Sequence, residues 1–283
     1  MIRNQSELGR KFLDLHQGSK MLVLPNAWDA ASARVFEDAG FSVVGTSSAG
    51  AAFSLGYPDG QKISREEMLG VIGRIAGAVE VPVTADMEAG FGATPEEVAG
   101  TTQAVIAAGA VGMNLEDGVE GKPEYLADLN LQKEIIRAVL ETAESAGVPF
   151  VLNARTDIFL NGVGPAETRL ARAIERLNAY REAGAPCLFA PGVKDRETIA
   201  QLVRGVRGPL NILATVGTPP IAELQQLGVA RVSVGSGPMR ATLGFLGRMA
   251  RELRDQGVFT MMTEGAPTYA EVNRLFQPRQ GRS

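Results

Sequence analysis

Two pairs of acidic residues, each placed directly after a short apolar stretch, are the side chains of this chain best suited to chemistry. Asp86 and Glu88 stand one residue apart after one stretch, and Glu116 and Asp117 follow another. A Gly-rich bend, Gly90 to Gly92, comes after the first pair and would let the backbone approach a ligand. Hard divalent cations bind oxygen ligands, and Mg²⁺ usually keeps several waters as well. The two pairs therefore predict a Mg²⁺ site, with Mn²⁺ as an alternative.

Further polar residues follow other apolar stretches of the chain. Ser47, Ser48 and Ala49 form a small turn that could aim consecutive backbone N–H groups at an anion. Arg155 offers a fork of donors that matches a carboxylate or a phosphonate. Asp59 adds a fifth acidic side chain. Together with the acidic pairs, these residues would chelate a 2-oxo acid and stabilise its enolate when the bond β to the ketone breaks.

Each of these residues also has a purely structural interpretation. Asp59 lies in a good turn sequence and would alone be read as a turn residue. Arg155 and Asp157 could form a structural ion pair, and Glu116 or Asp117 could cap the element that follows. Their coincidence after successive strands favours the functional interpretation, in which four acids hold one Mg²⁺ directly or through waters: Asp59, Asp86, Glu88 and Glu116.

The inventory of reactive side chains excludes several kinds of enzyme. The chain has a single cysteine and a single histidine. Cys187 lies in an apolar stretch that predicts an inert, buried thiol, and His16 precedes the first predicted strand. Ser-His-Asp hydrolysis, Cys-His proteolysis and a multi-histidine zinc site are therefore excluded.

Short apolar stretches alternate with longer amphipathic ones along the whole chain. The stretches recur at roughly the 30-residue spacing of βα units. Eight strands are predicted, over 21–24, 42–45, 81–84, 111–114, 149–153, 186–189, 210–213 and 231–234. Asn211, inside the seventh of these, is a further candidate for substrate binding. Eight such units without a break in composition predict a (β/α)₈ barrel, also called a TIM barrel, of the α/β class.

The intervening amphipathic stretches predict helices, for example over 96–107, 131–146, 167–183 and 195–203. Several such stretches end at an Ala-Gly pair just before the next strand, and a glycine there suits the left-handed position that terminates a helix. The pairs are Ala39-Gly40, Ala108-Gly109, Ala146-Gly147 and Ala183-Gly184. No glycine-rich dinucleotide or phosphate loop follows a strand, which argues against an open doubly wound sheet. We expect residues 1–283 to form one barrel domain, with extra C-terminal helices from about residue 238 that pack on a partner subunit.

Charge and hydropathy exclude other kinds of partner. The formal charge is −4 and basic residues form no block, so no nucleic-acid partner is expected. The N-terminus lacks an apolar signal segment, and no apolar run is long enough to cross a bilayer. We therefore expect a cytoplasmic protein with no membrane partner and a small-molecule substrate.

The motifs around these candidates resemble those of the isocitrate lyase/phosphoenolpyruvate mutase superfamily. The resemblance runs from about Leu24 to about Arg251. The spaced acids followed by Gly-Phe-Gly carry most of it, whereas the Trp and Ser elements alone would be weak. The motifs are Pro25-Asn26-Ala27-Trp28-Asp29, Thr46-Ser47-Ser48, Asp86-Met87-Glu88-Ala89-Gly90-Phe91-Gly92, Asn114-Leu115-Glu116-Asp117 and Asn153-Ala154-Arg155-Thr156-Asp157.

The resemblance implies a fold, a cofactor and roles for particular residues. It implies a (β/α)₈ barrel with Mg²⁺ held mainly by Asp86, and with outer-shell acids at Asp59, Glu88 and Glu116. It also implies substrate contacts, at Trp28, Ser47, Ser48, Ala49 and Arg155. Members of the superfamily are often tetramers that exchange the last barrel helix between subunits. We therefore expect a homo-oligomer, either a dimer or a tetramer.

Two positions depart from the superfamily pattern. Glu88 stands where the motif usually has a second aspartate, one methylene shorter, which a water-mediated ligand tolerates. In the segment after Glu116, isocitrate and methylisocitrate lyases carry an acid/base cysteine, and phosphonate-handling members carry a lysine with an asparagine two residues on. Here Lys122 falls on the family lysine, and Glu124 stands at the cysteine or asparagine position. The resulting candidates for catalysis are Lys122, Glu124 and Arg155.

The leading hypothesis is a Mg²⁺-dependent lyase that cleaves a C–C bond in a small 2-oxo or 2-hydroxy dicarboxylate. Decarboxylation of an oxaloacetate-like substrate needs no thiol, because Lys122 or water can return the proton. Retro-aldol or Claisen cleavage, as in methylisocitrate lyase, is the related reaction. The alternative is P–C bond chemistry on phosphonopyruvate or phosphoenolpyruvate, as a mutase or hydrolase, against which the missing asparagine weighs.

Two hypotheses from other classes remain. A Schiff-base aldolase on the same barrel needs a lysine at the end of a strand, and none of the six lysines lies within a predicted strand. A non-catalytic homologue that binds 2-oxo acids is the other, because the segment after Glu116 is altered.

Overall fold

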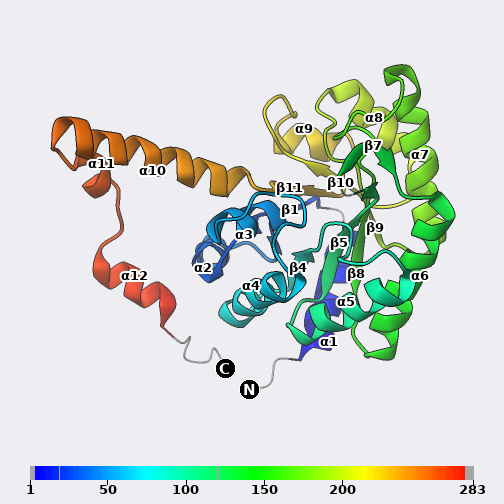
Figure 1. Cartoon of the computed structure of the whole chain (residues 1–283), viewed down its shortest axis with the longest axis horizontal. Coiled ribbons are helices and arrows are strands. Elements are labelled where there is room, and N and C mark those ends of the chain that lie inside the picture. Colours follow the sequence, from blue (N-terminus) through cyan, green and yellow to red (C-terminus); the bar gives the residue numbers. More distant parts are fainter. Residues whose placement is uncertain (1–3, 19, 120, 278–283) are drawn as a thin grey trace.

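The structure is a computed structural model that describes residues 4–18, 20–119 and 121–277. A parallel sheet, drawn in Figure 1, forms the centre of the molecule, and helices surround it. Its strands follow the order β1-β11-β10-β9-β8-β5-β4-β3-β2. Their bounds are β1 Leu22–Leu24, β2 Asn26–Ala27, β3 Val44–Thr46, β4 Val83–Asp86, β5 Gly112–Glu116, β8 Val151–Arg155, β9 Cys187–Phe189, β10 Leu210–Leu213 and β11 Arg231–Ser233.

The two end members of this order are halves of one strand. β1 pairs with β11 and β2 pairs with β3, and only Pro25 separates the halves. Proline has no N–H to donate, so it interrupts the strand, but its carbonyl still accepts the N–H of Gly45 at 2.9 Å. The sheet therefore closes on itself as a barrel of eight strands, and the predicted (β/α)₈ fold is confirmed.

Helices follow the strands as the sequence predicts. Their bounds are α2 Ala30–Asp38, α3 Ser48–Ser54, α4 Arg65–Ala78, α5 Pro95–Ala107, α6 Leu129–Ser145, α7 Ala166–Glu182, α8 Arg196–Gly205 and α9 Ile221–Gln226. The glycines expected to terminate α2, α5, α6 and α7 have positive φ angles, at Gly40 (91°), Gly109 (97°), Gly147 (68°) and Gly184 (109°). The predicted left-handed terminations are therefore confirmed.

The amino-terminal end of the barrel is covered by helix α1, Gln5–Gln17. Phe12 is fully buried, and a Cβ built on Gly112 would lie 2.9 Å from its ring. Gly9 fits against the backbone of Pro149, where a Cβ would lie 2.0 Å from the carbonyl oxygen. Both glycines thus let α1 pack closely against the start of β5 and β8, so this end of the barrel is closed by packing.

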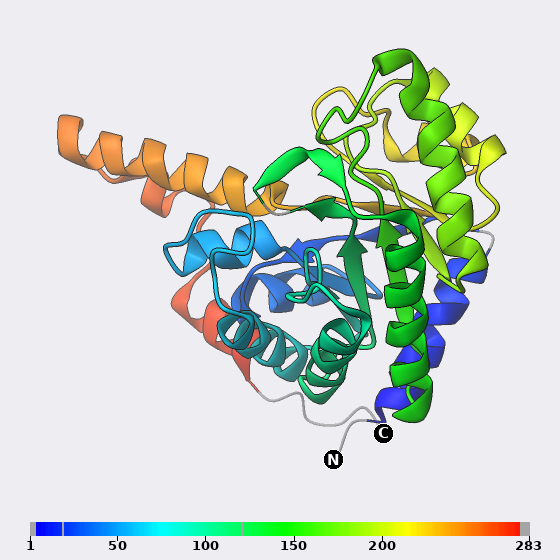
Figure 2. The same cartoon turned by 45° about the vertical axis from the view of Figure 1, so that its right-hand side comes forward.

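A two-stranded hairpin lies at the opposite end of the barrel. It consists of β6, Gly118–Val119, and β7, Lys122–Leu126, which pair antiparallel with an irregular register. Figure 2 shows it in green beyond the arrowheads of β5 and β8. The sequence did not predict these strands, because the segment lacks an alternating apolar pattern.

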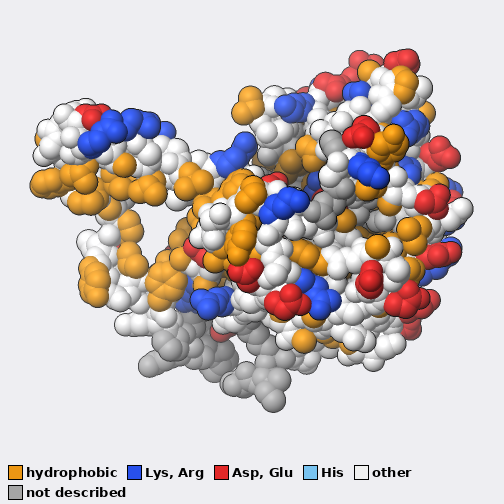
Figure 3. All heavy atoms as spheres, viewed as in Figure 1, with side chains coloured by type: hydrophobic (Ala, Val, Ile, Leu, Met, Phe, Trp, Pro, Cys, Tyr) orange, Lys and Arg blue, Asp and Glu red, His pale blue; other side chains and the backbone are white. Residues whose placement is uncertain are grey.

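The C-terminal helices extend beyond the barrel, as predicted. They are α10 Gly237–Gln256, α11 Thr260–Thr263 and α12 Tyr269–Phe276. Figure 1 shows α10 projecting away from the barrel and α12 returning to α2, where Nε of Arg34 donates to the carbonyl of Leu275 at 2.9 Å. Apolar side chains line one edge of α10 in Figure 3, and basic ones line the other. Among the described residues, no helix combines the length and apolarity needed to cross a membrane.

Candidate active site

A cavity of about 390 Å³ opens at the carboxyl end of the barrel strands. It gathers side chains from the connections after β3, β4, β5 and β8 and from the hairpin. The lining residues are Ser48, Asp59, Gly60, Gln61, Lys62, Glu88, Glu116, Gly118, Val119, Gly121, Arg155, Asp157, Leu160 and Asn161. Residues far apart in the sequence, including three of the predicted acids, thus share one cavity.

Asp86, the last residue of β4, is held just beside this cavity by hydrogen bonds to both carboxylate oxygens. Its Oδ2 accepts the hydroxyl of Ser48 at 2.7 Å and the N–H of the same residue at 3.1 Å. Its Oδ1 accepts Nδ2 of Asn114 at 3.2 Å, and its own N–H donates to Oγ1 of Thr46 at 2.8 Å. The carboxylate is therefore fixed in orientation by two neighbouring strands and by the start of α3.

A chain of amides inside the barrel fixes Asn114 in turn. Nδ2 of Asn153, on β8, donates to Oδ1 of Asn114 at 2.8 Å. Because its oxygen is occupied, the amide of Asn114 points its nitrogen toward Asp86. The sequence placed both asparagines in motifs but predicted no role for them, and their adjacency depends on the pairing of β5 with β8, which is parallel and in register at these residues.

Glu88 adopts a backbone conformation that is unusual for a residue other than glycine. Its φ is 51°, and Gln61, which faces it across the cavity rim, has a φ of 54°. The N–H of Gln61 donates to Oε2 of Glu88 at 2.8 Å, and the N–H of Glu116 donates to its carbonyl at 2.9 Å. Left-handed non-glycine residues are strained and concentrate at functional sites. The strain here aims the carboxylate of Glu88 at the shared cavity.

Arg155, at the end of β8, is held by two carboxylates. Its Nε and Nη2 donate to the two oxygens of Asp157 at 2.6 and 3.0 Å, and its Nη1 lies 2.6 Å from Oε2 of Glu116. The ring of Phe189 lies 5.9 Å from the guanidinium carbon. The ion pair with Asp157 that the sequence left open is therefore formed. Arg155 can therefore bind a ligand only through the N–H donors that these two carboxylates do not use.

Negative charge dominates the cavity. Burial, followed by the neighbouring charge of Asp86, raises the pKa of Glu88 to about 7. Burial also raises the pKa of Glu116, although the guanidinium of Arg155 acts in the opposite direction. Burial likewise raises the pKa of Asp157. Raised pKa values mean that the ionised forms of these carboxylates are destabilised, and a nearby cation would stabilise them. The electrostatics of the cavity therefore favour cation binding.

The donor set fits a divalent cation that keeps most of its waters. Within the described part of the chain, no three carboxylate, imidazole or thiol groups converge as direct ligands of one metal ion. Mg²⁺ is often bound through one or two carboxylates and several waters. Asp86 would hold it directly, and the acids lining the cavity would hold its waters: Asp59, Glu88 and Glu116.

The small turn predicted to bind an anion is already engaged in internal hydrogen bonds. The N–H of Ser48 donates to Asp86, and the N–H of Gly50 donates to the hydroxyl of Ser47 at 3.1 Å. Ser47 is thereby the N-cap of α3, and Ala49 is buried within that helix. The expected row of free backbone donors is thus reduced, and the hydroxyl of Ser48 is the part of the turn at the cavity.

Four other candidates lie outside the lining of this cavity. Trp28 borders a separate groove between α2 and α4. Asn211 is fully buried inside the barrel, where its Nδ2 donates to the hydroxyl of Ser233 at 3.1 Å. Lys122 and Glu124 are exposed on β7. Roles of these four residues in substrate binding and catalysis stay predictions.

The structure adds residues that the sequence did not single out. Lys62 and Asn161 line the cavity, and the N–H of Asn161 donates to the carbonyl of Asp157 at 2.9 Å. The loop after β8 thus turns back over the site. Only the general rule that βα loops surround a barrel's site could have indicated Asn161 from the sequence.

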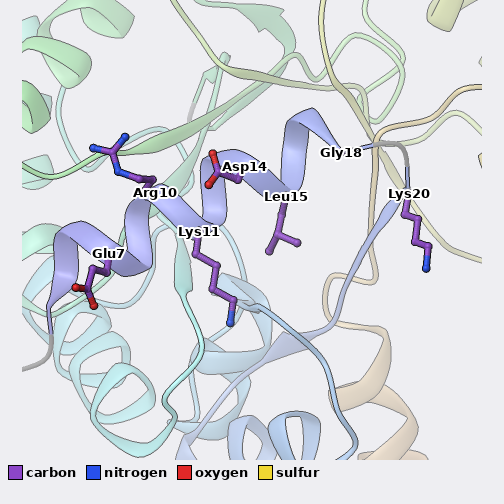
Figure 4. Close-up of a pocket in the computed structure, with 7 residues that line it drawn as sticks. All are labelled: Glu7, Arg10, Lys11, Asp14, Leu15, Gly18 and Lys20. Carbon is purple, nitrogen blue, oxygen red and sulfur yellow. The ribbon is translucent and has the colours of Figure 1, made fainter.

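A larger cavity elsewhere has a different character. It measures about 620 Å³, and all seven residues in Figure 4 come from α1 or the segment just after it. Glu7, Lys11 and Leu15 point to one side of the helix in Figure 4. It is a groove along a single helix, whereas the smaller cavity unites the ends of several strands. Convergence of strand ends, rather than volume, therefore locates the candidate site.

Comparison with known proteins identifies the family of the chain. A family model described as phosphoenolpyruvate phosphomutase matches residues 12–254. The chain is 31% identical to 2-methylisocitrate lyase of Escherichia coli (strain K12), over 75% of this chain and 72% of the relative. It is 30% identical to oxaloacetate decarboxylase of Rhodopseudomonas palustris (strain HaA2), over 92% of this chain and 89% of the relative.

A solved structure shows the same architecture. The crystal structure of a putative lyase/mutase from Burkholderia cenocepacia J2315 superposes with a TM-score of 0.90 at 39% identity, and 97% of each chain is covered. The agreement extends over the barrel and most of the C-terminal segment.

Proposed function

The chain belongs to the phosphoenolpyruvate phosphomutase family and is an enzyme of the isocitrate lyase/phosphoenolpyruvate mutase superfamily, and from this premise we propose that it cleaves a C–C bond in a small 2-oxo or 2-hydroxy dicarboxylate. Mg²⁺ is the proposed cofactor, and decarboxylation of an oxaloacetate-like substrate is the proposed reaction. The observation that carries the proposal is a cavity lined by carboxylates around one arginine, with neither a thiol nor an imidazole among its lining residues.

The position of the only cysteine supports decarboxylation over the lyase reactions that need a thiol. Cys187 is fully buried at the start of β9 and is not among the residues that line the cavity at the carboxyl end. Decarboxylation breaks one C–C bond, releases carbon dioxide and leaves an enolate that takes up one proton. No second nucleophile or acid/base thiol is required.

Each residue of the site would have a distinct role in binding the substrate, orienting the groups around it or supplying a proton. The remaining N–H donors of Arg155 bind a substrate carboxylate, and its pairing with Asp157 and Glu116 keeps the guanidinium in place. The hydroxyl of Ser48 lies at the same cavity and orients Asp86. When bound, Mg²⁺ would supply positive charge close to the enolate oxygen. The enolate would take its proton from water or from Lys122. Lys122 could donate it only if the hairpin brought the lysine to the cavity.

The second candidate function is cleavage or rearrangement of a P–C bond. The description of the matching family favours it, and an arginine fork also suits a phosphonate. Glu124 stands at the position where phosphonate-handling members carry asparagine, and if the hairpin brought it to the cavity its negative charge would oppose binding of a phosphonate. We therefore rank this function second.

The two functions are separated by one paired assay. Pyruvate formation from oxaloacetate and phosphate release from phosphonopyruvate are measured at the same Mg²⁺ concentration. Because free divalent cations also promote oxaloacetate decarboxylation, Asp86→Asn protein is the control. Pyruvate formation above that control supports the first function, and phosphate release supports the second. Rates equal to the control with both substrates would contradict both.

We also propose a homo-oligomer built through the C-terminal helices. Several large apolar side chains of this region are exposed: Leu243, Phe245, Leu246, Leu253, Val258, Phe259 and Met262. Apolar area of this extent usually marks an interface. Light scattering should give a multiple of the 29.9 kDa chain mass, and Leu246→Glu should lower it. A monomeric wild-type protein would contradict this part of the proposal.

A further inference from the structure

A buried cluster outside the cavity joins the hairpin to the site. Asp117 is fully buried, and its carboxylate accepts three hydrogen bonds. Its Oδ2 accepts the hydroxyl of Tyr180 at 2.6 Å and Nε of Arg176 at 2.9 Å, and its Oδ1 accepts the N–H of Asp157 at 2.9 Å. We refer to Asp117, Arg176 and Tyr180 as the Asp117 cluster. Its two α7 members lie about 60 residues downstream of the aspartate and stack along one helix face.

The cluster holds both ends of the hairpin. Asp117 directly precedes β6, and Ala127 directly follows β7. The N–H of Ala127 donates to the carbonyl of Asp117 at 2.8 Å, and its carbonyl accepts Nη2 of Arg176 at 2.8 Å. A single guanidinium therefore bonds to the entry and the exit of the hairpin, which closes the segment at its base.

The same aspartate fixes the turn that carries Arg155. Oδ1 of Asp117 accepts a hydrogen bond from the N–H of Asp157, and the carboxylate of Asp157 accepts hydrogen bonds from Nε and Nη2 of Arg155. Gly118 lies so close that a Cβ built on it would be 3.0 Å from Oδ2 of Asp157. The backbone of the hairpin thus runs alongside the carboxylate that holds the arginine. A shift at Asp117 would displace the hairpin and Arg155 together.

The cluster is balanced in charge and lacks access to the cavity. Arg176 supplies the positive charge that a buried carboxylate needs. Burial, together with the charge of Asp117, keeps the pKa of Tyr180 well above its ordinary value, so its hydroxyl stays a donor. Neither Arg176 nor Tyr180 is among the residues that line the cavity. Their influence on a ligand must therefore pass through Asp117 and, for Arg176, also through Ala127.

We propose that Asp117, Arg176 and Tyr180 are positioning residues: they hold the β6–β7 hairpin and Arg155 in one arrangement, and so they set the affinity for the substrate carboxylate without setting the affinity for the cation. The inference rests on the proposed function, in which Arg155 binds the substrate and Asp86 the metal. A brace that only stabilised the fold would instead change both affinities in step with stability.

Two variants test the proposal while keeping the buried charge balance. Tyr180→Phe removes one hydroxyl, and Arg176→Lys keeps the positive charge but loses the fork that reaches both Asp117 and Ala127. The matched control is Arg172→Lys, on the same helix, because Nη1 of Arg172 donates to the carbonyl of Val163 at 3.3 Å and Asp117 is not among its partners. Oxalate, a planar mimic of a pyruvate enolate, serves as the probe.

The measurements are calorimetric titrations with Mg²⁺ alone and with oxalate at saturating Mg²⁺, and hydrogen exchange of the backbone amides. Both variants should bind oxalate about 10-fold or more weakly, the size typical when a supporting hydrogen bond is lost, with unchanged Mg²⁺ affinity. The amides of Ala127 and Asp157 should exchange faster than in the wild type. Arg172→Lys protein should match the wild type in all three readouts.

The proposal is overturned if folded Tyr180→Phe and Arg176→Lys proteins bind oxalate as the wild type does. It is also overturned if the oxalate and Mg²⁺ affinities fall together, which is the signature of a structural brace. Should the wild type bind Mg²⁺ but not oxalate, the proposed function fails. The exchange of the Ala127 and Asp157 amides then decides the inference alone: acceleration in the two variants supports it, and exchange equal to that of the control overturns it.

Discussion

The two ends of the barrel bury polar groups in opposite ways. At the amino-terminal end, Arg231 is fully buried beneath α1, and its Nε and Nη1 have no hydrogen-bond partner among the described residues. The ring of Phe12 lies 5.8 Å from its guanidinium carbon, and Nε2 of the neighbouring His16 is likewise unpartnered in the described structure. At the carboxyl end, Asp86 and Arg155 are hydrogen-bonded to neighbours on several strands.

In the described part of the chain, the amino-terminal end lacks hydrogen-bond acceptors, whereas the carboxyl end lacks positive charge. The amino-terminal end is closed by packing, so its unpaired donors lower stability and no ligand can reach them. At the carboxyl end, the side chains of Asp86 and Arg155 are hydrogen-bonded, but carboxylates outnumber cations among the residues that line the open cavity. A bound cation can correct an excess of charge beside solvent. We therefore expect changes at the carboxyl end to alter ligand binding, and changes at the amino-terminal end to alter stability.

The largest effect should come from Asp86. Asp86→Ala removes the proposed direct ligand, so Mg²⁺-dependent turnover should fall to the rate of the uncatalysed reaction. Asp86→Ala also leaves the N–H and hydroxyl of Ser48 and the amide of Asn114 without their acceptor, so a moderate fall in the melting temperature should accompany the loss of turnover. Asp86→Asn keeps the shape and the hydrogen bond from Ser48, and it should be equally inactive if charge is what matters. Retained Mg²⁺-dependent turnover in Asp86→Asn protein would argue against a metal at this position.

His16 should make the amino-terminal end sensitive to acid. Burial, and then the charge of Arg231, lowers the pKa of His16 from 6.5 to about 4 in the folded protein. Between these values the unfolded chain binds more protons, so stability is present above pH 6.5 and is lost as the pH falls toward 4. The free energy of unfolding, measured by urea denaturation, should fall by about 3 kcal/mol as the pH is lowered from 6.5 to 4. His16→Gln should remove that part of the pH dependence, and an unchanged slope in this variant would be the contrary result.

Glu88 should show a smaller effect on metal binding. Glu88→Gln removes a charge that acts on the cation through water, so Mg²⁺ affinity should fall about 10–100-fold. Titration calorimetry measures this fall directly, and the N–H of Gln61 still finds an acceptor in the amide oxygen. A loss as complete as that of Asp86→Ala would show that both carboxylates are direct ligands, against the arrangement proposed here.

Arg231 should show the smallest effect, and in the stabilising direction. Replacing a buried, incompletely paired charge by an apolar side chain of similar size is often neutral or stabilising. Arg231→Met should therefore leave turnover unchanged and should keep or raise the free energy of unfolding, by about 1 kcal/mol or more. Chemical denaturation measures the change. A strong loss of stability would mean that the contact of Arg231 with the ring of Phe12 outweighs its unpaired donors.

The sequence predicted the barrel because its strands are buried on both faces and read as short apolar runs. The β5 strand, for example, is predicted over 111–114 and observed over Gly112–Glu116. The acids after β4 and β5 could be placed near one another because all parallel strands end at the same side of the sheet. These inferences use only local pattern and the direction of the chain.

Features that depend on pairing or on distant contacts could not be predicted. The hairpin over 118–126 has no apolar alternation, and its position depends on Arg176 and Tyr180 of α7. Trp28 shares a motif with the site, yet it borders a separate groove. The rotamer of Asn114 is set by Asn153 on the adjacent strand. Each of these depends on geometry between segments that a linear pattern does not contain.

The most direct test of the central claim is a crystal of the protein soaked with Mn²⁺ and oxalate, with the metal located by its anomalous scattering. We predict one strong peak beside the cavity, ligated by a carboxylate oxygen of Asp86. Waters should lie between the ion and the carboxylates of Glu88 and Glu116, and oxalate should reach Arg155. A peak elsewhere, or no peak at saturating Mn²⁺ and oxalate, would contradict this prediction.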